Sequence, residues 1–145
     1  MTAHDHPATR ESHAFGAALT VAIVGLALTT AYIHLTLGSL LFTLNAIGYA
    51  GLASLYVIGS VAPFSLVARF SWFPRIALAG FAALTIVAWL VQGPYFGLAY
   101  FAKGVELTLI SLIVVDVIRV YGSPFGLVRA AFASIFGGRS GMAAA

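Results

Sequence analysis

The chain has 145 residues, of which 61% are hydrophobic and only 8% are charged, and its mean hydropathy is +1.04. A soluble domain carries roughly a quarter charged residues, so this composition excludes an ordinary water-facing surface and indicates an integral membrane protein. The sequence contains no cysteine, which excludes a disulfide, a thiolate metal site and a catalytic thiol. Its net charge of +3 comes from single basic residues near the ends of apolar segments, which is typical of membrane orientation and not of nucleic-acid binding.

Four apolar segments each approach the ~20 residues that a membrane-spanning helix needs. They cover residues 14–34, 39–60, 74–92 and 97–121. Residues that interrupt helices stand between them, namely Gly38, Pro63 and the pair Gly93-Pro94. The segments do not alternate apolar and polar residues as membrane strands do. We therefore predict an all-α fold: a single polytopic transmembrane four-helix bundle made of two helical hairpins.

The flanking and connecting segments are predicted to lie outside the hydrocarbon region. Residues 1–13 are polar and form a cytoplasmic N-terminus, and the apolar stretch after them is longer than the ~7–15 residues of a signal-peptide core. Residues 64–75 mix aromatic residues with arginines, as interfacial loops do. Residues 122–145 are predicted to form a short helix on the cytoplasmic surface and, after Gly137, a flexible tail.

The distribution of basic residues predicts the orientation. Four spans place both termini and the loop of residues 61–74 on one side, and the turns near residues 37 and 94 on the other. The first side then receives all the arginines, which are Arg10, Arg69, Arg75, Arg119, Arg129 and Arg139. The remaining basic residue, Lys103, lies toward the other side. By the positive-inside rule we expect a multi-pass protein of the cell (inner) membrane with both termini cytoplasmic.

The last predicted span carries two acids that cannot both lie outside the membrane. Glu106 and Asp116 are separated along the helix by about 15 Å, against a hydrocarbon thickness of ~30 Å. We expect Asp116 and Arg119 to form an ion pair at the cytoplasmic interface, which leaves Glu106 about 12 Å below the outer surface. An unpaired charge there costs at least ~2.5–3.5 kcal/mol. Lys103 is on the same side of the helix and either pairs with Glu106 or extends to the headgroups.

Matching depths in the membrane gives a candidate polar membrane site. Its members in the outer half are His34, Asn45, Gln92, Lys103 and Glu106, with Tyr49 one turn deeper than Asn45. They either line one pocket that faces the external side or act as separate, individually satisfied residues. Glu106 is correspondingly either a proton or cation site tuned by Lys103, or a hydrogen-bond partner that fixes helix packing.

No motif in the sequence indicates an enzyme. The chain has no P-loop, nucleophile elbow, dinucleotide fingerprint or close carboxylate pair. We expect no metal site and no cofactor, because His34 is the only histidine within a predicted span and one chain cannot supply a haem with two histidines there. A haem could be bound only between two chains, each of which supplies its own His34. The aromatic residues are predicted to be interface anchors and not a substrate cage, namely Trp72, Trp89, Tyr95, Phe96 and Tyr100.

Two stretches, residues 34–52 and 93–116, carry a resemblance to known proteins. Their short motifs are His-x-x-x-Gly from His34, Phe-x-x-Asn-x-x-Gly from Phe42, and Lys-x-x-Glu from Lys103. In these features the chain resembles an uncharacterised group of small four-span integral membrane proteins of bacteria and archaea. The resemblance implies a four-helix architecture and adds no activity.

The function expected from these features is that of a small, non-enzymatic membrane protein. Short connections and few charges favour a protein that associates with itself or is an accessory subunit of a larger membrane complex. Its expected partners are therefore the lipid bilayer and other membrane subunits or a second copy, and no nucleic acid. The alternatives are a small channel or transporter that uses the polar site around Glu106, and a quinone- or haem-associated redox anchor.

Overall fold

The computed structural model describes residues 7–61, 64–93 and 95–136, and all regular structure within these ranges is helical. The helices are α1 (Pro7–Thr36), α2 (Leu40–Val61), α3 (Ser65–Arg69), α4 (Trp72–Gln92), α5 (Gly97–Tyr121) and α6 (Pro124–Phe136). The predicted all-α fold is thus confirmed for the described part of the chain. The predicted flexible tail after Gly137 lies outside the described residues, as do residues 1–6 of the N-terminus.

Each predicted apolar segment corresponds to one long helix, although residue 39 precedes α2, which begins at Leu40. The helix α1 begins at Pro7, earlier than expected, because the polar residues before position 14 continue its first turns. The loop predicted over residues 64–75 is corrected: it contains the short helix α3, and α4 begins within it at Trp72. Within the described residues, three helical segments are long and apolar enough to cross a membrane: His13–Thr36, Leu40–Val61 and Trp72–Gln92. The helix α5, with its four charged side chains, is not among them.

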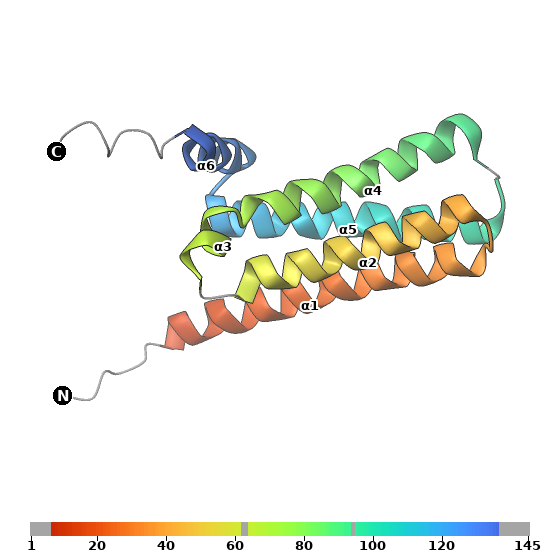
Figure 1. Ribbon diagram of the computed structural model, residues 1–145. Coiled ribbons are helices and arrows are strands. Elements are labelled where there is room, and N and C mark those ends of the chain that lie inside the picture. Colours follow the sequence, from red (N-terminus) through yellow and green to blue (C-terminus); the bar gives the residue numbers. More distant parts are fainter. Residues whose placement is uncertain (1–6, 62–63, 94, 137–145) are drawn as a thin grey trace, which may run out of the picture.

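The four long helices lie side by side (Figure 1). Two of them, α2 and α5, each contact both α1 and α4. The connection from α1 to α2 and that from α4 to α5 are at the same end, and we call this the loop end. The start of α1 lies at the opposite end with α3 and α6, which we call the terminal end (Figure 1).

Glycine makes two of the chain reversals sharp. Gly38, between α1 and α2, has φ of 70°, and Gly122, directly after α5, has φ of 76°. Both values are in the left-handed region that glycine enters without a steric penalty. The amide of Gly122 donates to the carbonyl oxygen of Ile118 at 2.8 Å and so closes the last turn of α5.

The buried core runs along the centre of the four long helices. Its largest fully buried apolar side chains are Ile23, Leu78, Leu109 and Ile113, with the tyrosines Tyr49 and Tyr56 beside them. The outward faces carry many exposed large apolar side chains, among them Leu44, Ile47, Leu84 and Leu107. An outer surface this rich in apolar side chains is compatible with a membrane protein.

We predict that Leu109→Ala destabilises the fold much more than Leu107→Ala on the same helix. Leu109 is fully buried, whereas Leu107 is 56% exposed. Truncating a buried leucine costs about 2–5 kcal/mol because a cavity is left behind, while the exposed site loses little packing. The measurement is thermal unfolding of both variants in the same detergent. Equal losses would contradict the placement of α5 at the centre of the packing.

Candidate functional site

The carboxylate of Glu106 lies in the interior of the four helices. The side chain is fully buried, and Lys103, one turn earlier on α5, is 8% exposed. The ammonium Nζ of Lys103 donates to Glu106 Oε2 at 2.7 Å, and the hydroxyl of Thr85 on α4 donates to the same oxygen at 2.9 Å. Of the two alternatives for Lys103, the structure therefore shows the pair with Glu106.

Hydroxyl groups extend this contact to a third helix. The hydroxyl of Tyr49 on α2 lies 2.8 Å from that of Thr85. The single proton of Thr85 has two acceptors within reach, Glu106 Oε2 and the carbonyl oxygen of Ala82 at 2.8 Å, and with either one the Thr85 oxygen accepts the proton of Tyr49. Lys103 Nζ also donates to the backbone carbonyl oxygen of Thr85, at 3.3 Å. The acid thus ties α2, α4 and α5 together.

His34 completes the set from α1. Its Nδ1 lies 2.8 Å from the carbonyl oxygen of Thr30, which accepts the ring proton and thereby fixes the orientation of the imidazole. The other ring nitrogen, Nε2, faces Glu106 Oε1 at 3.9 Å, beyond hydrogen-bond distance. Within the described residues Glu106 Oε1 has no hydrogen-bond partner. One oxygen of the acid is therefore fully used and the other is not.

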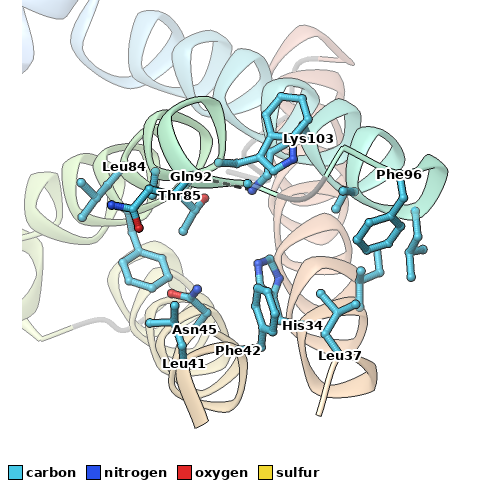
Figure 2. A pocket seen from close by; sticks show the side chains of 18 residues that line it. His34, Leu37, Leu41, Phe42, Asn45, Leu84, Thr85, Gln92, Phe96 and Lys103 are labelled. Carbon is cyan, nitrogen blue, oxygen red and sulfur yellow. Dashed lines mark hydrogen bonds between the residues drawn. The ribbon is translucent and has the colours of Figure 1, made fainter. Parts of the chain in front are cut away.

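A cavity of about 450 Å³ opens beside this cluster at the loop end (Figure 2). All four long helices contribute to its walls, and most lining side chains are apolar. Four of the five predicted site residues line it: His34, Asn45, Gln92 and Lys103. The fifth, Glu106, is joined to the cavity through its bonds to Lys103 and Thr85. The structure thus brings the predicted residues together around one cavity.

The aromatic residues at the loop end differ from expectation. Trp89 and Phe96 line the cavity, a position that the prediction of interface anchors did not include. Tyr95 and Tyr100 are exposed and pack against the ring of Trp89 with centroid distances of 5.3 and 5.1 Å. These contacts hold the indole in place at the cavity wall.

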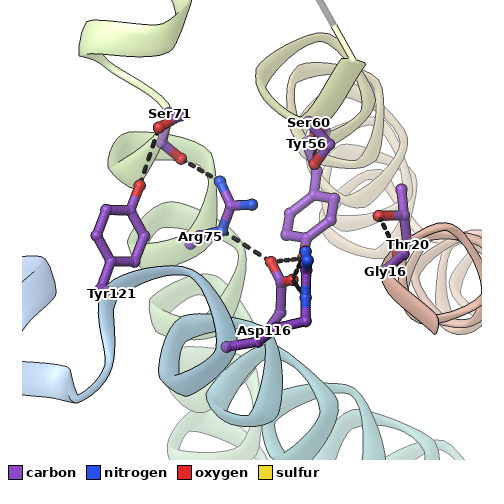
Figure 3. Close-up of polar contacts among 9 residues, drawn as sticks. Gly16, Thr20, Tyr56, Ser60, Ser71, Arg75, Asp116 and Tyr121 are labelled. Atoms are coloured by element: carbon purple, nitrogen blue, oxygen red, sulfur yellow. Dashed lines mark hydrogen bonds and ion pairs between the residues drawn. The ribbon is translucent and has the colours of Figure 1, made fainter. Parts of the chain in front are cut away.

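The second acid of α5, Asp116, is the centre of a separate network near the terminal end (Figure 3). Arg119 donates to its Oδ1 at 2.7 Å, so the predicted ion pair is present. Asp116 is nevertheless fully buried, in contrast to the interface position expected for it. Its Oδ2 accepts from Tyr56 on α2 at 2.5 Å and from Arg75 on α4 at 2.8 Å. Both oxygens of this acid are bonded.

Arginine side chains connect the helices at the terminal end to one another. Arg75 also donates to the carbonyl oxygen of Ser71 at 2.6 Å, and the Ser71 hydroxyl lies 2.9 Å from that of Tyr121 (Figure 3). On α1, Gly16 leaves space for Arg119, because a Cβ there would lie 2.8 Å from a guanidinium nitrogen. The short α3 reaches α6, since Arg69 donates to the carbonyl oxygen of Ser134.

Sequence reasoning missed Arg75, Tyr56 and Thr85. Arg75 was interpreted as a topology signal, although it shares helical spacing with the buried residues Leu78 and Ala82. The i, i+3 and i+7 spacing of Arg75, Leu78 and Ala82 is therefore the sequence signal that Arg75 is buried. The same spacing places Tyr56 in the stripe of Tyr49 and Ala53 on α2.

Apolar side chains separate the two polar networks. On α5, Leu109 and Ile113 lie between Glu106 and Asp116, and on α4 Leu78 and Ala82 lie between Arg75 and Thr85. On α2, Ala53 separates Tyr49 from Tyr56. The buried stripes of α2, α4 and α5 are thus polar at both ends and apolar in the middle.

Neither metal ligands nor known relatives assign this site. Within residues 7–61, 64–93 and 95–136, no group of three or more His, Asp or Glu side chains could hold a metal ion. Comparison with protein families, with curated proteins and with solved structures finds no match to the chain. The resemblance to small four-span proteins stays a prediction, and the case for function depends on the geometry.

We predict that Arg75→Gln destabilises the fold more than Arg119→Gln. The Arg75 side chain is 4% exposed and that of Arg119 33% exposed, although both donate to Asp116. Removing a buried partner leaves an uncompensated charge and costs about 3–5 kcal/mol, whereas water and headgroups can replace a half-exposed partner. Unfolding of detergent-solubilised variants by heat or denaturant measures the difference. A larger loss for Arg119→Gln would contradict the buried role of Arg75.

Proposed function

We propose that this protein is a small, non-enzymatic integral membrane protein with four spans, and that it binds an uncharged, lipid-soluble molecule in the cavity at its loop end. The observation that carries the proposal is the cavity of about 450 Å³, whose apolar walls surround a few polar groups next to the Lys103–Glu106 pair. Small-molecule sites in proteins have this volume and this mixture of side chains.

The burial of its charges supports α5 as the fourth span. Lys103, Glu106 and Asp116 all point into the interior, and the outward face of α5 carries Leu107, Val114, Val115 and Ile118. With 25 residues, α5 is about 37 Å long and exceeds the ~30 Å of hydrocarbon. Charged residues within spans face the bundle interior and pair with one another, as these do.

The positions of the arginines support an orientation. Arg69, Arg75, Arg119 and Arg129 lie on α3, on the first turn of α4, on the last turn of α5 and on α6, all toward the terminal end (Figure 1). Lys103 lies toward the loop end. Under the positive-inside rule the terminal end is cytoplasmic and the cavity is on the external side.

Single cysteines test this orientation, because the chain has none of its own. We expect a membrane-impermeant maleimide to label Ser39→Cys in intact cells, since Ser39 is exposed at the loop end. Ala133→Cys, exposed on α6, should react only after the cells are permeabilised. Labelling of both, or of Ala133→Cys alone, in intact cells would contradict the four-span topology with a cytoplasmic terminal end.

The charge balance and the apolar middle layer support binding over ion conduction. Lys103 and Glu106 neutralise each other, so the cavity has no net charge that would favour an ion. The fully buried Leu109 and Leu78, with Ile113, separate this cavity from the network of Asp116. A conducting channel needs a polar or wet path across the whole membrane, and the apolar layer interrupts it.

The cavity opens toward the lipid side. Leu41 on α2 and Leu84 on α4 both line it, and both side chains are exposed on the outer surface, at 67% and 63%. A molecule dissolved in the bilayer therefore reaches the site without crossing water. The other exposed apolar side chains suit lipid and neighbouring helices equally, so association with itself or with a larger membrane complex stays a prediction.

A cavity-filling variant tests the binding function. We expect Ala99→Phe to reduce at least tenfold an uncharged molecule that co-purifies with the wild type, because Ala99 lines the cavity and is 8% exposed. Ala83→Phe, an identical change on the outward face of α4, should retain it. Organic extraction of protein purified in mild detergent, followed by mass spectrometry, measures the amount. A wild type without such a molecule, or equal amounts in both variants, would overturn the proposal.

A further inference from the structure

The donor that a ligand meets at the inner end of the cavity is Lys103. A lysine ammonium has three hydrogens. Glu106 Oε2 accepts one and the carbonyl oxygen of Thr85 accepts another. The third is available to a molecule in the cavity, which Lys103 lines (Figure 2). The complementary group on a ligand is a hydrogen-bond acceptor, such as a carbonyl oxygen.

The charge of the site selects an uncharged ligand. Lys103 and Glu106 are 2.7 Å apart and form a neutral pair in a mostly apolar surrounding. A ligand carboxylate would lie near the negative charge of Glu106, and a ligand ammonium near the positive charge of Lys103. Either would add an uncompensated charge to a site with little water, which is costly.

The walls select a flat ring. Aromatic side chains from three elements line the cavity, namely Phe42, Phe81, Trp89 and Phe96. Aromatic walls favour planar ligands through offset stacking and edge contacts. The ring of Phe81 is held edge-on by Tyr49 at a centroid distance of 4.9 Å, which keeps this wall in position.

The rest of the cavity wall offers further hydrogen-bond donors and an opening for the hydrocarbon tail of a ligand. Asn45 and Gln92 line the cavity, and each amide carries N–H donors for a second oxygen. The opening beside the exposed residues Leu41 and Leu84 leads toward the lipid side and suits a hydrocarbon tail.

From these features we infer that the ligand of the proposed binding function belongs to the quinone class: an uncharged ring with carbonyl oxygens and an apolar tail. Lys103 donates to one carbonyl oxygen, the amides of Asn45 and Gln92 donate to the other, and the aromatic walls hold the ring. The inference concerns binding and requires no redox step. It rests on the proposed function and adds the chemistry of the ligand.

Two matched probes test the inference. Decylubiquinone carries the ring oxygens, whereas decylbenzene has the same tail on a ring without oxygen. The protein carries Trp72→Phe, so that Trp89 in the cavity wall is the fluorescent reporter, and is placed in phosphatidylcholine nanodiscs. Bound decylubiquinone quenches the fluorescence of Trp89, and this quenching measures its affinity. Decylbenzene does not quench, so its affinity is measured by competition, as the recovery of Trp89 fluorescence when it displaces decylubiquinone. Ala99→Phe in the same background controls for quenching from the lipid phase.

We expect decylubiquinone to bind at least about tenfold more tightly than decylbenzene, the contribution of a hydrogen bond from a charged donor. The double variant Lys103→Met, Glu106→Met removes the charged donor and its charge together without adding an N–H group, and should reduce this preference at least about threefold, the amides of Asn45 and Gln92 retaining the rest. Equal affinities of the two probes in the Trp72→Phe protein, in which Lys103 and Glu106 are intact, overturn the quinone assignment without recourse to the double variant. If neither probe binds while a molecule still co-purifies with the wild type, the assignment fails and the binding function stands; if none co-purifies, both fail.

Discussion

A carboxylate among apolar helices is stable only when its charge is compensated nearby, and α5 carries two such carboxylates. Each is satisfied by the helices around it: Glu106 by Thr85 of α4 and by Lys103 of its own helix, and Asp116 by Tyr56 of α2 and Arg75 of α4. These two polar clusters therefore join α4 to α5 at both ends, and the cluster of Asp116 also joins α2 to them. The apolar layer of Leu78, Leu109 and Ile113 then fills the space between them.

The same requirement explains why the cavity is at the loop end. At the terminal end, two arginines, Tyr56 and the crossing α6 fill the space around Asp116. At the loop end Glu106 is contacted by one lysine and by Thr85, and no arginine lies beside it within the described residues. Small residues such as Ala99 and Ala102 line the space there, and the aromatic rings of Trp89 and Phe96 stand at its wall. The space that remains is the cavity.

Much of the arrangement follows from the sequence, because helix length, glycine and proline positions and arginine placement are local signals. Gly38 and the Gly93-Pro94 pair marked the reversals, and depth matching grouped His34, Asn45, Gln92 and Lys103, which line one cavity. Depth along a helix is set by residue number, but rotation about its axis depends on the partner helices. Arg75 is therefore expected at the interface from the sequence, whereas packing turns it inward, and the half-buried Trp89 lies at the cavity wall. Thr85 carries no sequence signal of its own, because its place in the site depends on its contacts with Tyr49 and Glu106 on neighbouring helices.

The two acids of α5 differ in whether the side chain that compensates their charge also reaches a cavity. Tyr56 and Arg75 bond one oxygen of Asp116, and Arg119 bonds the other, so the network is saturated and has no capacity for a ligand. Glu106 accepts two bonds on one oxygen and none on the other, and the lysine that neutralises it lines an open cavity. The requirement for charge compensation is therefore met in two ways: the arginines of Asp116 close a saturated network, whereas the lysine of Glu106 keeps its contact with a cavity.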